Sequence, residues 1–250
     1  FSILPISFII GSAVLQFKII LIILFFLKEL SGDRKYFIEL IKDKFFLSLV
    51  LLWIYLNINA LFGINYEISL IRSIFFFRYI LLIFAFVYFF RNKHIRDKVI
   101  NFWTIILLIV LFDIFFEFLF GKNIFGFESP MKNERIVSFF KDELIVGSFL
   151  ASFLFIIFGK FFYEDKIILS AFLFIIFSAG IFITGERSVS IKIIISMTLI
   201  ILFMIENPKF KIYTTLFSIL IVSLIFSTSK LNIRYSSFYS HLEKNFKKEQ

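Results

Sequence analysis

The chain has 250 residues, of which 60% are hydrophobic and 42 are phenylalanine, and its mean hydropathy is +0.96. Apolar residues run through nearly its whole length, which excludes a soluble domain with one buried core. The net charge of +9 does not indicate a nucleic-acid partner, because Lys and Arg gather in short links between apolar runs, as in membrane proteins. The absence of cysteine excludes disulfides, thiolate metal sites and cysteine nucleophiles.

Apolar runs bounded by charged links predict about eight membrane-spanning helices. A helix needs roughly 17 to 25 residues to cross about 30 Å of hydrocarbon, whereas the strands of a membrane barrel are alternating stretches of about ten residues. We therefore expect an all-α, polytopic transmembrane helical bundle that forms a single domain over 1–250. In chain order, the expected spans are 3–27 (one tilted helix or two short ones), 45–62, 73–90, 99–120, 144–159, 167–183, 189–205 and 212–228.

The charge of the links predicts the orientation. Thirteen Lys and Arg lie in alternate links, at 28–44, 91–98, 160–166 and 206–211, and six lie in the others, at 63–72, 121–142 and 184–188. By the positive-inside rule, the first set faces the cytoplasm. The link 121–142 is then the main outward loop, and 229–250 begins a further outward loop. Because the chain starts at Phe1 and stops within charged residues, we expect it to be truncated at both ends.

Two arginines lie on the predicted outward face. Arg187 stands between the sixth and seventh runs, and Arg135 lies in the main outward loop. An arginine at a bilayer centre costs roughly 2.5 to 3.5 kcal/mol, so a position close to the hydrocarbon needs a reason. Guanidinium groups grip phosphate oxygens in pairs, and a helix start at Ser188 would add N–H donors. Either the pair holds a phosphate-bearing substrate, or each arginine pairs with its neighbour, Glu134 or Glu186.

Three further charged residues fall within apolar runs. Asp113 and Glu117 stand one helical turn apart near the end of the fourth run, hence on one face. Carboxylates there would activate an acceptor hydroxyl, orient an arginine or form a polar helix end. Arg78 lies in the middle of the third run, where an unpaired charge is expensive. It therefore needs a partner across the bundle or a substrate phosphate.

The sequence predicts neither a metal site nor a cofactor. Its two histidines, His94 and His241, fall on opposite predicted sides, and neither belongs to a His–carboxylate pattern with the spacing of metal sites. His94 is expected to be a solvated residue in a basic link. Asp142 and Glu143 precede the fifth run, where acidic residues favour a helix N-terminus, so capping is their expected role.

Three stretches resemble the O-antigen polymerase and ligase family. The most specific lies in the main outward loop and continues into the fifth run, over 120–127 and 135–148. Thr184-Gly185-Glu186-Arg187-Ser188 is similar to the Thr-Gly-x-Arg motif at the start of a later helix in these proteins, and Phe77-Arg78-Tyr79 is similar to an Arg-aromatic step in an earlier one. The resemblance covers roughly 70–230.

The resemblance implies a metal-independent membrane glycosyltransferase of GT-C-like architecture in the bacterial inner membrane, with its site facing the periplasm. Its partners would be an undecaprenyl-pyrophosphate-linked glycan, a growing polysaccharide or lipid A-core acceptor, and the lipid bilayer. Arg135 and Arg187 match the arginines that hold the lipid pyrophosphate. His241, whose flanks differ from the family pattern, is the candidate for the histidine that assists the acceptor hydroxyl. The expected substrate-binding set is Arg78, Asp113, Glu117, Glu186 and Ser188.

Two other classes of protein stay open. A transporter, such as a lipid-linked glycan flippase, would line its path with charged residues of the spans. Transporters usually carry internal repeats and broken helices, and the sequence shows little of either. A noncatalytic membrane scaffold would leave the outward arginines free to vary.

Overall fold

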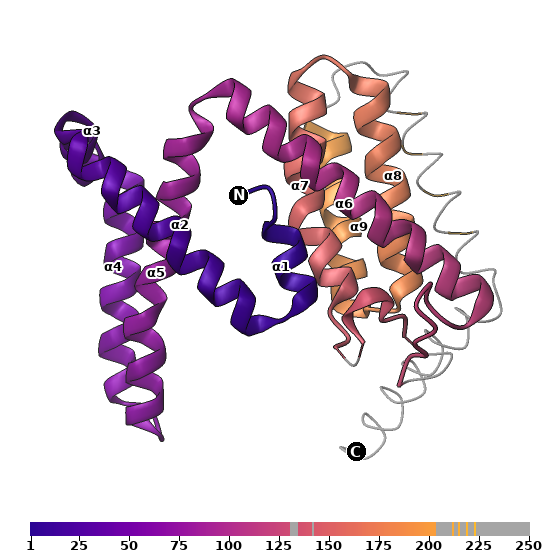
Figure 1. Cartoon of the computed structure of the whole chain (residues 1–250), viewed down its shortest axis with the longest axis horizontal. Coiled ribbons are helices and arrows are strands. Elements are labelled where there is room, and N and C mark those ends of the chain that lie inside the picture. The colour runs from indigo at the N-terminus through magenta and orange to yellow at the C-terminus, as the bar shows by residue number, and fades with distance from the viewer. Residues whose placement is uncertain are drawn as a thin grey trace. The chain divides into compact units, whose positions relative to one another are not determined.

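The computed structural model describes residues 1–130, 135–141 and 143–203, together with Ile212, Thr215, Ile219 and Ser223. Within these residues the chain forms nine α-helices and one 3-10 turn, and no strand (Figure 1). The expected all-α class is therefore confirmed for the described part of the chain. The chain divides into two compact units, Phe1–Val99 (unit 1) and Ile100–Gln250 (unit 2).

Unit 1 holds five complete helices and the start of a sixth. They are α1 (Leu4–Ile10), α2 (Ser12–Gly32), α3 (Arg34–Lys42), α4 (Lys44–Leu61), α5 (Tyr66–Phe90) and the first residues of α6 (Lys93–Phe120). The first apolar run is thus two helices. They separate at Gly11, whose φ of 140° is a conformation that glycine adopts readily and other residues rarely do.

The basic link between the first two apolar runs is itself helical. Asp33 Oδ1 accepts a hydrogen bond from Tyr36 N at 3.0 Å and so caps α3. Asp43 Oδ1 accepts one from Phe45 N at 2.9 Å and caps α4. Aspartate is a favoured residue at helix N-termini because its carboxylate satisfies an N–H without an intrahelical partner. The two aspartates therefore divide this stretch into α2, α3 and α4.

Helices α4 and α5 lie side by side (Figure 1). Trp53 Nε1 donates a hydrogen bond to Ser73 O at 3.0 Å, and Ser73 Oγ donates one to Asn57 Oδ1 at 3.0 Å. Polar side chains that bond across apolar helices contribute to helix association in membranes, where the hydrophobic effect between helices is weak. These bonds fix the pairing of α4 with α5.

Unit 2 holds the rest of α6, the 3-10 turn η1 (Ser138–Phe140), α7 (Val146–Tyr163), α8 (Ile167–Thr184) and α9 (Arg187–Phe203). Helices α7 and α8 form an antiparallel pair (Figure 1), and α9 contacts both. Helix α8 passes close to α6, because a Cβ added at Gly180 would lie 2.2 Å from Leu111 Cδ1. The core between these helices consists of fully buried apolar side chains, among them Leu107, Ile114, Leu150, Phe177, Ile181 and Ile193.

Five helices of the described chain, α4 to α8, are long and apolar enough to cross a membrane. This identifies a multi-pass membrane protein, for which a lipid bilayer is the compatible environment. The count is lower than the eight expected spans. The longer helix of the first run, α2, carries Lys18, Lys28 and Glu29. Helix α9 has only 17 residues, and most of the expected span 212–228 lies outside the described residues. The GT-C-like architecture stays a prediction.

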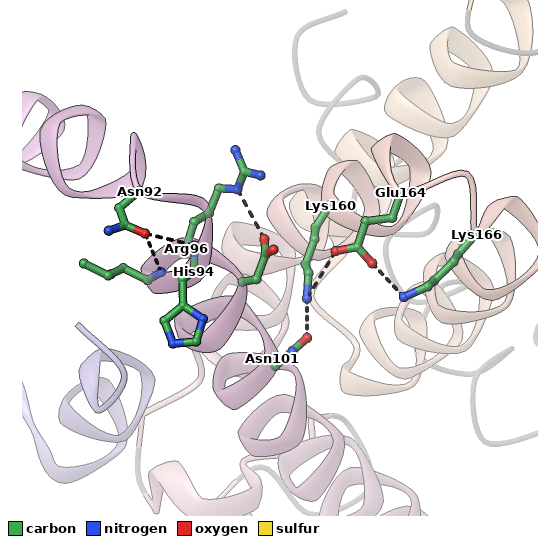
Figure 2. A network of polar contacts seen from close by, with 9 residues as sticks. Asn92, His94, Arg96, Asn101, Lys160, Glu164 and Lys166 are labelled. Carbon is green, nitrogen blue, oxygen red and sulfur yellow. Dashed lines mark hydrogen bonds and ion pairs between the residues drawn. The ribbon is translucent and has the colours of Figure 1, made fainter.

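Charged residues tie helices together where α7 ends and α8 begins. Lys160 Nζ donates a hydrogen bond to Asn101 Oδ1 of α6 and lies 3.7 Å from Glu164 Oε1. Glu164 Oε2 lies 2.8 Å from Lys166 Nζ (Figure 2). The Lys160 side chain is only 5% exposed, so its charge depends on these partners.

In unit 1, the start of α6 is capped by Asn92. Its Oδ1 accepts hydrogen bonds from His94 N at 3.0 Å and from Ile95 N at 3.4 Å (Figure 2). His94 itself is exposed, in agreement with the solvated role expected for it.

Candidate functional site

Those predicted site residues of unit 2 that the structure describes gather at the end where α6 and α8 finish and α7 and α9 begin, which we call the loop end. Ile136 N donates a hydrogen bond to Thr184 O at 3.2 Å. Arg135 directly precedes Ile136, and Arg187 follows Thr184 by three residues. This one backbone bond therefore brings together the two segments that carry the arginines. Both arginines are half-buried.

The last turns of α6 present two buried carboxylates to the following loop. Asp113 Oδ1 accepts a hydrogen bond from Ile124 N at 2.8 Å, and its Oδ2 accepts one from Ser138 Oγ at 2.6 Å. Glu117 Oε1 accepts from Val137 N at 3.3 Å, and its Oε2 accepts from Ser138 N at 2.6 Å. Each of the four carboxylate oxygens thus accepts a hydrogen bond from the loop.

This arrangement explains how two charges are accommodated beside an apolar core. Asp113 is 0% exposed and Glu117 is 4% exposed, and a buried carboxylate is very costly unless it is hydrogen-bonded. Backbone N–H groups and a serine hydroxyl meet that requirement. The geometry favours an anchoring role for Asp113 and Glu117. Their expected role in substrate binding stays a prediction.

Two residues that the sequence did not single out complete the anchor. Asn123 Nδ2 donates to Ser138 O at 2.8 Å, and Asn123 Oδ1 accepts from Phe127 N at 2.8 Å. Both Asn123 and Ser138 are buried. Serine and asparagine are common in loops for many reasons, so their presence in this loop does not by itself predict an anchoring role. The available signal was the acidic pair itself, because two carboxylates within an apolar run require donors from elsewhere in the chain.

Glu186 caps a helix that is distant in sequence. Its Oε1 accepts a hydrogen bond from Gly147 N at 2.6 Å, and its Oε2 accepts from Ser148 N at 3.1 Å and from Ser148 Oγ at 2.6 Å. These N–H groups belong to the first turn of α7, where a negative charge also interacts favourably with the helix dipole. Glu186 therefore joins the α8–α9 turn to the start of α7.

The sequence assigned these roles differently. One alternative left open by the sequence paired Glu186 with Arg187, but the hydrogen bonds described for its carboxylate oxygens go to α7. The sequence predicted that Asp142 and Glu143 cap that helix. The Glu143 side chain is exposed, and Asp142 lies outside the described residues.

Gly147 is required by the closeness of Glu186. A Cβ at this position would lie 2.7 Å from Thr184 Oγ1 and 3.0 Å from Glu186 Cδ. We expect Gly147→Ala to lower the free energy of unfolding by about 1–3 kcal/mol, as overpacked sites do, which thermal unfolding in detergent would measure. Gly159→Ala is the matched control in the same helix, because a Cβ there meets nothing within 4 Å. Equal melting temperatures for the two variants would contradict this reading.

The turn between α8 and α9 sets the position of Arg187. Gly185 ends α8 with a φ of 78°, a left-handed conformation that glycine adopts without steric cost. Only Gly185 and Glu186 separate the two helices, and α9 begins at Arg187. The helix start expected at this stretch is thereby confirmed. The Ser188 side chain is exposed in the first turn of α9.

The other predicted residues belong to unit 1 or lie outside the described residues. Arg78 lies in α5 of unit 1, where its Nη2 donates to Tyr79 OH at 3.0 Å and its guanidinium carbon lies 4.9 Å from the centre of the Tyr79 ring. The buried Arg78 Nε has no hydrogen-bond partner. Among the described residues its hydrogen-bond acceptor is thus a sequence neighbour, not the expected residue of another helix. His241, Glu134 and the segment 229–250 lie outside the described residues.

The described residues contain no group of three or more acidic or histidine side chains that could hold a metal ion.

The fold and the loop end together define a multi-pass helical membrane protein in which two arginine-bearing segments meet beside three hydrogen-bonded carboxylates. Comparisons with protein-family models, with curated proteins and with solved structures found no match.

Proposed function

We propose that the chain is a membrane glycosyltransferase of the O-antigen polymerase or ligase kind, and that it holds an undecaprenyl-pyrophosphate-linked glycan at the loop end. The observation that carries the proposal is the hydrogen bond from Ile136 N to Thr184 O. It sets the segment of Arg135 beside the turn that leads to Arg187. The resemblance of 120–148 and 184–188 to that family supports the same assignment.

The chemistry of the reaction calls for cations at such a place. An acceptor hydroxyl oxygen attacks the anomeric carbon, the bond from this carbon to the pyrophosphate oxygen breaks, and negative charge grows on the departing lipid pyrophosphate. Fixed guanidinium groups at a membrane interface stabilise this charge effectively, because water screens it less there. Their paired N–H donors also match phosphate oxygens. Two arginines would therefore do what a metal ion does in other enzymes.

Two local features favour an anionic ligand at the loop end. No described residue forms a hydrogen bond or an ion pair with the Arg135 side chain, so none of them occupies the donors that a ligand would need. Helix α9 begins at Arg187, and a helix N-terminus adds oriented N–H groups and positive potential. The carboxylates of Asp113, Glu117 and Glu186 do not oppose this, since each is engaged by hydrogen bonds from the chain.

The proton of the acceptor hydroxyl needs a base, for which His241 stays the candidate from the sequence. The acceptor would be a growing polysaccharide or a lipid A-core, and the site would face the periplasm of a bacterial inner membrane. These assignments rest on the family resemblance and the distribution of basic links.

A reconstitution experiment tests the proposal. The full-length chain would be placed in proteoliposomes with labelled undecaprenyl-pyrophosphate oligosaccharide and an acceptor, with and without EDTA. We expect new glycosidic bonds, seen as longer chains or as label transferred to the acceptor, at the same rate in EDTA because the proposed site uses no metal. Movement of labelled lipid across the bilayer without a new bond would instead identify a flippase. The absence of both a new glycosidic bond and lipid movement would favour a noncatalytic scaffold.

A further inference from the structure

Ser138 has an unusual backbone conformation for a residue with a side chain. Its φ is 49°, in the left-handed region where Cβ crowds the backbone and which residues other than glycine rarely occupy. Ser138 is also fully buried. A residue persists in such a conformation only where its surroundings over-determine it, and such residues cluster at functional sites.

The surroundings of Ser138 engage all of its polar groups. Its N–H donates to Glu117 Oε2 and its hydroxyl donates to Asp113 Oδ2, each at 2.6 Å. Its carbonyl oxygen accepts from Asn123 Nδ2 at 2.8 Å. Hydrogen bonds to buried charged groups are stronger than neutral ones. The last turns of α6 therefore hold Ser138 in a single position.

The residues between Ser138 and Arg135 are held as firmly. Val137 N donates to Glu117 Oε1 and Ile136 N donates to Thr184 O. The side chains of Ile136 and Val137 are buried. Three consecutive backbone N–H groups are thus bonded to two different helices. Arg135 is the residue directly before this fixed run, so its location follows from the run.

We propose that Ser138 is a positioning residue. Through its bonds to Asp113 and Glu117, Ser138 holds Arg135 beside the turn between α8 and α9 that precedes Arg187, so that both guanidinium groups bind one lipid pyrophosphate. This inference rests on the proposed function. In this role, Asp113 and Glu117 of α6 contribute to substrate binding by anchoring the loop, without contacting the substrate themselves.

A double-mutant cycle separates positioning from general stabilisation. The affinity of labelled undecaprenyl pyrophosphate would be measured in nanodiscs for the parent, Ser138→Ala, Arg135→Ala and the double variant. We expect Ser138→Ala to weaken binding about tenfold, as the loss of a buried hydrogen bond to a charge does. In the Arg135→Ala background the same change should have no further effect, because the residue through which Ser138 acts is gone.

A matched control removes a comparable hydroxyl elsewhere in unit 2. Ser178 is buried in α8, and its Oγ donates to Phe174 O at 2.7 Å. Ser178→Ala should leave the affinity unchanged. If Ser138→Ala does not fold, Ser138→Gly takes its place, because glycine lacks the hydroxyl yet accepts the left-handed conformation.

The outcomes distinguish this inference from the proposed function. Equal weakening by Ser138→Ala in both backgrounds, or no weakening in the parent, would overturn the positioning role. Unchanged binding in Arg135→Ala would overturn the proposed function and the shared pyrophosphate site.

A distance measurement tests the positioning step without any ligand. Spin labels would be attached at Lys141→Cys and Ser188→Cys, both exposed positions in a chain without cysteine. Ser138→Ala should broaden this distance distribution, and an unchanged distribution would refute positioning.

Discussion

Replacing Arg187 with alanine is expected to lower the rate of glycan transfer by at least about 10²–10³-fold, the loss seen when a fixed donor to developing negative charge is removed. Arg187 begins α9 directly after the turn that Glu186 and Gly185 form, so the turn fixes the point from which its side chain would reach the proposed pyrophosphate. The measurement is the chain-length ladder of surface glycan in cells that carry the variant, together with the transfer rate in proteoliposomes. Protein levels in the membrane must match those of the parent.

Three companion variants show whether the effect comes from a specific pair of guanidinium groups. Arg135→Ala should cause a loss of similar size. Arg187→Lys keeps the charge but loses the planar fork, so it should recover only part of the activity. Lys141→Ala removes an exposed cation from the same loop and should leave the ladder unchanged. Normal ladders in both alanine variants of the arginines would refute the pyrophosphate clamp.

Glu186→Ala is expected to cause the largest loss of stability, about 2–4 kcal/mol in the free energy of unfolding. The change leaves Gly147 N, Ser148 N and Ser148 Oγ without their acceptor at the start of α7, and unsatisfied donors near a helix N-terminus are costly. Glu186→Gln should fall between the parent and Glu186→Ala, because its amide keeps one acceptor oxygen but sets an NH₂ group against a donor. Thermal or denaturant unfolding in detergent would give the values.

Glu143→Gln is the control for Glu186. It removes the same charge from an exposed position before α7 and should change the free energy of unfolding by no more than about 0.5 kcal/mol. If Glu186→Gln and Glu143→Gln were equally stable, the cap that Glu186 provides would contribute nothing measurable to the free energy of unfolding.

Hydropathy predicted the helices of the apolar runs because the bilayer requires continuous apolar stretches. Runs 45–62 and 167–183 correspond closely to α4 and α8, and run 99–120 ends with α6 but omits its first six residues. The charged boundaries were less informative, since charge marks the limit of the hydrocarbon and not the limit of the helix. Helix α5 therefore begins at Tyr66, seven residues before the expected 73, and the basic link 28–44 contains α3.

The site was predictable only where its geometry is local. The spacing of Asp113 and Glu117 placed them on one face of a helix, and the structure confirms that both carboxylates meet the same segment. Their partner Ser138 lies 25 residues beyond Asp113 and 21 residues beyond Glu117, in a loop without periodicity. Glu186 reaches Gly147 across 39 residues. Contacts of this kind depend on tertiary packing, which a single sequence does not encode in any local pattern.

Helix α7 is anchored by charge at both of its ends. Glu186 grips its first turn, and near its last turn Lys160 is bonded to Asn101 of α6. A piston-like slide by one turn, about 5.4 Å, would strand a carboxylate at one end and an ammonium group at the other. The axial register of α7 is therefore locked. The proposed lipid-linked glycan would therefore have to enter or leave the loop end without a slide of α7 along its axis.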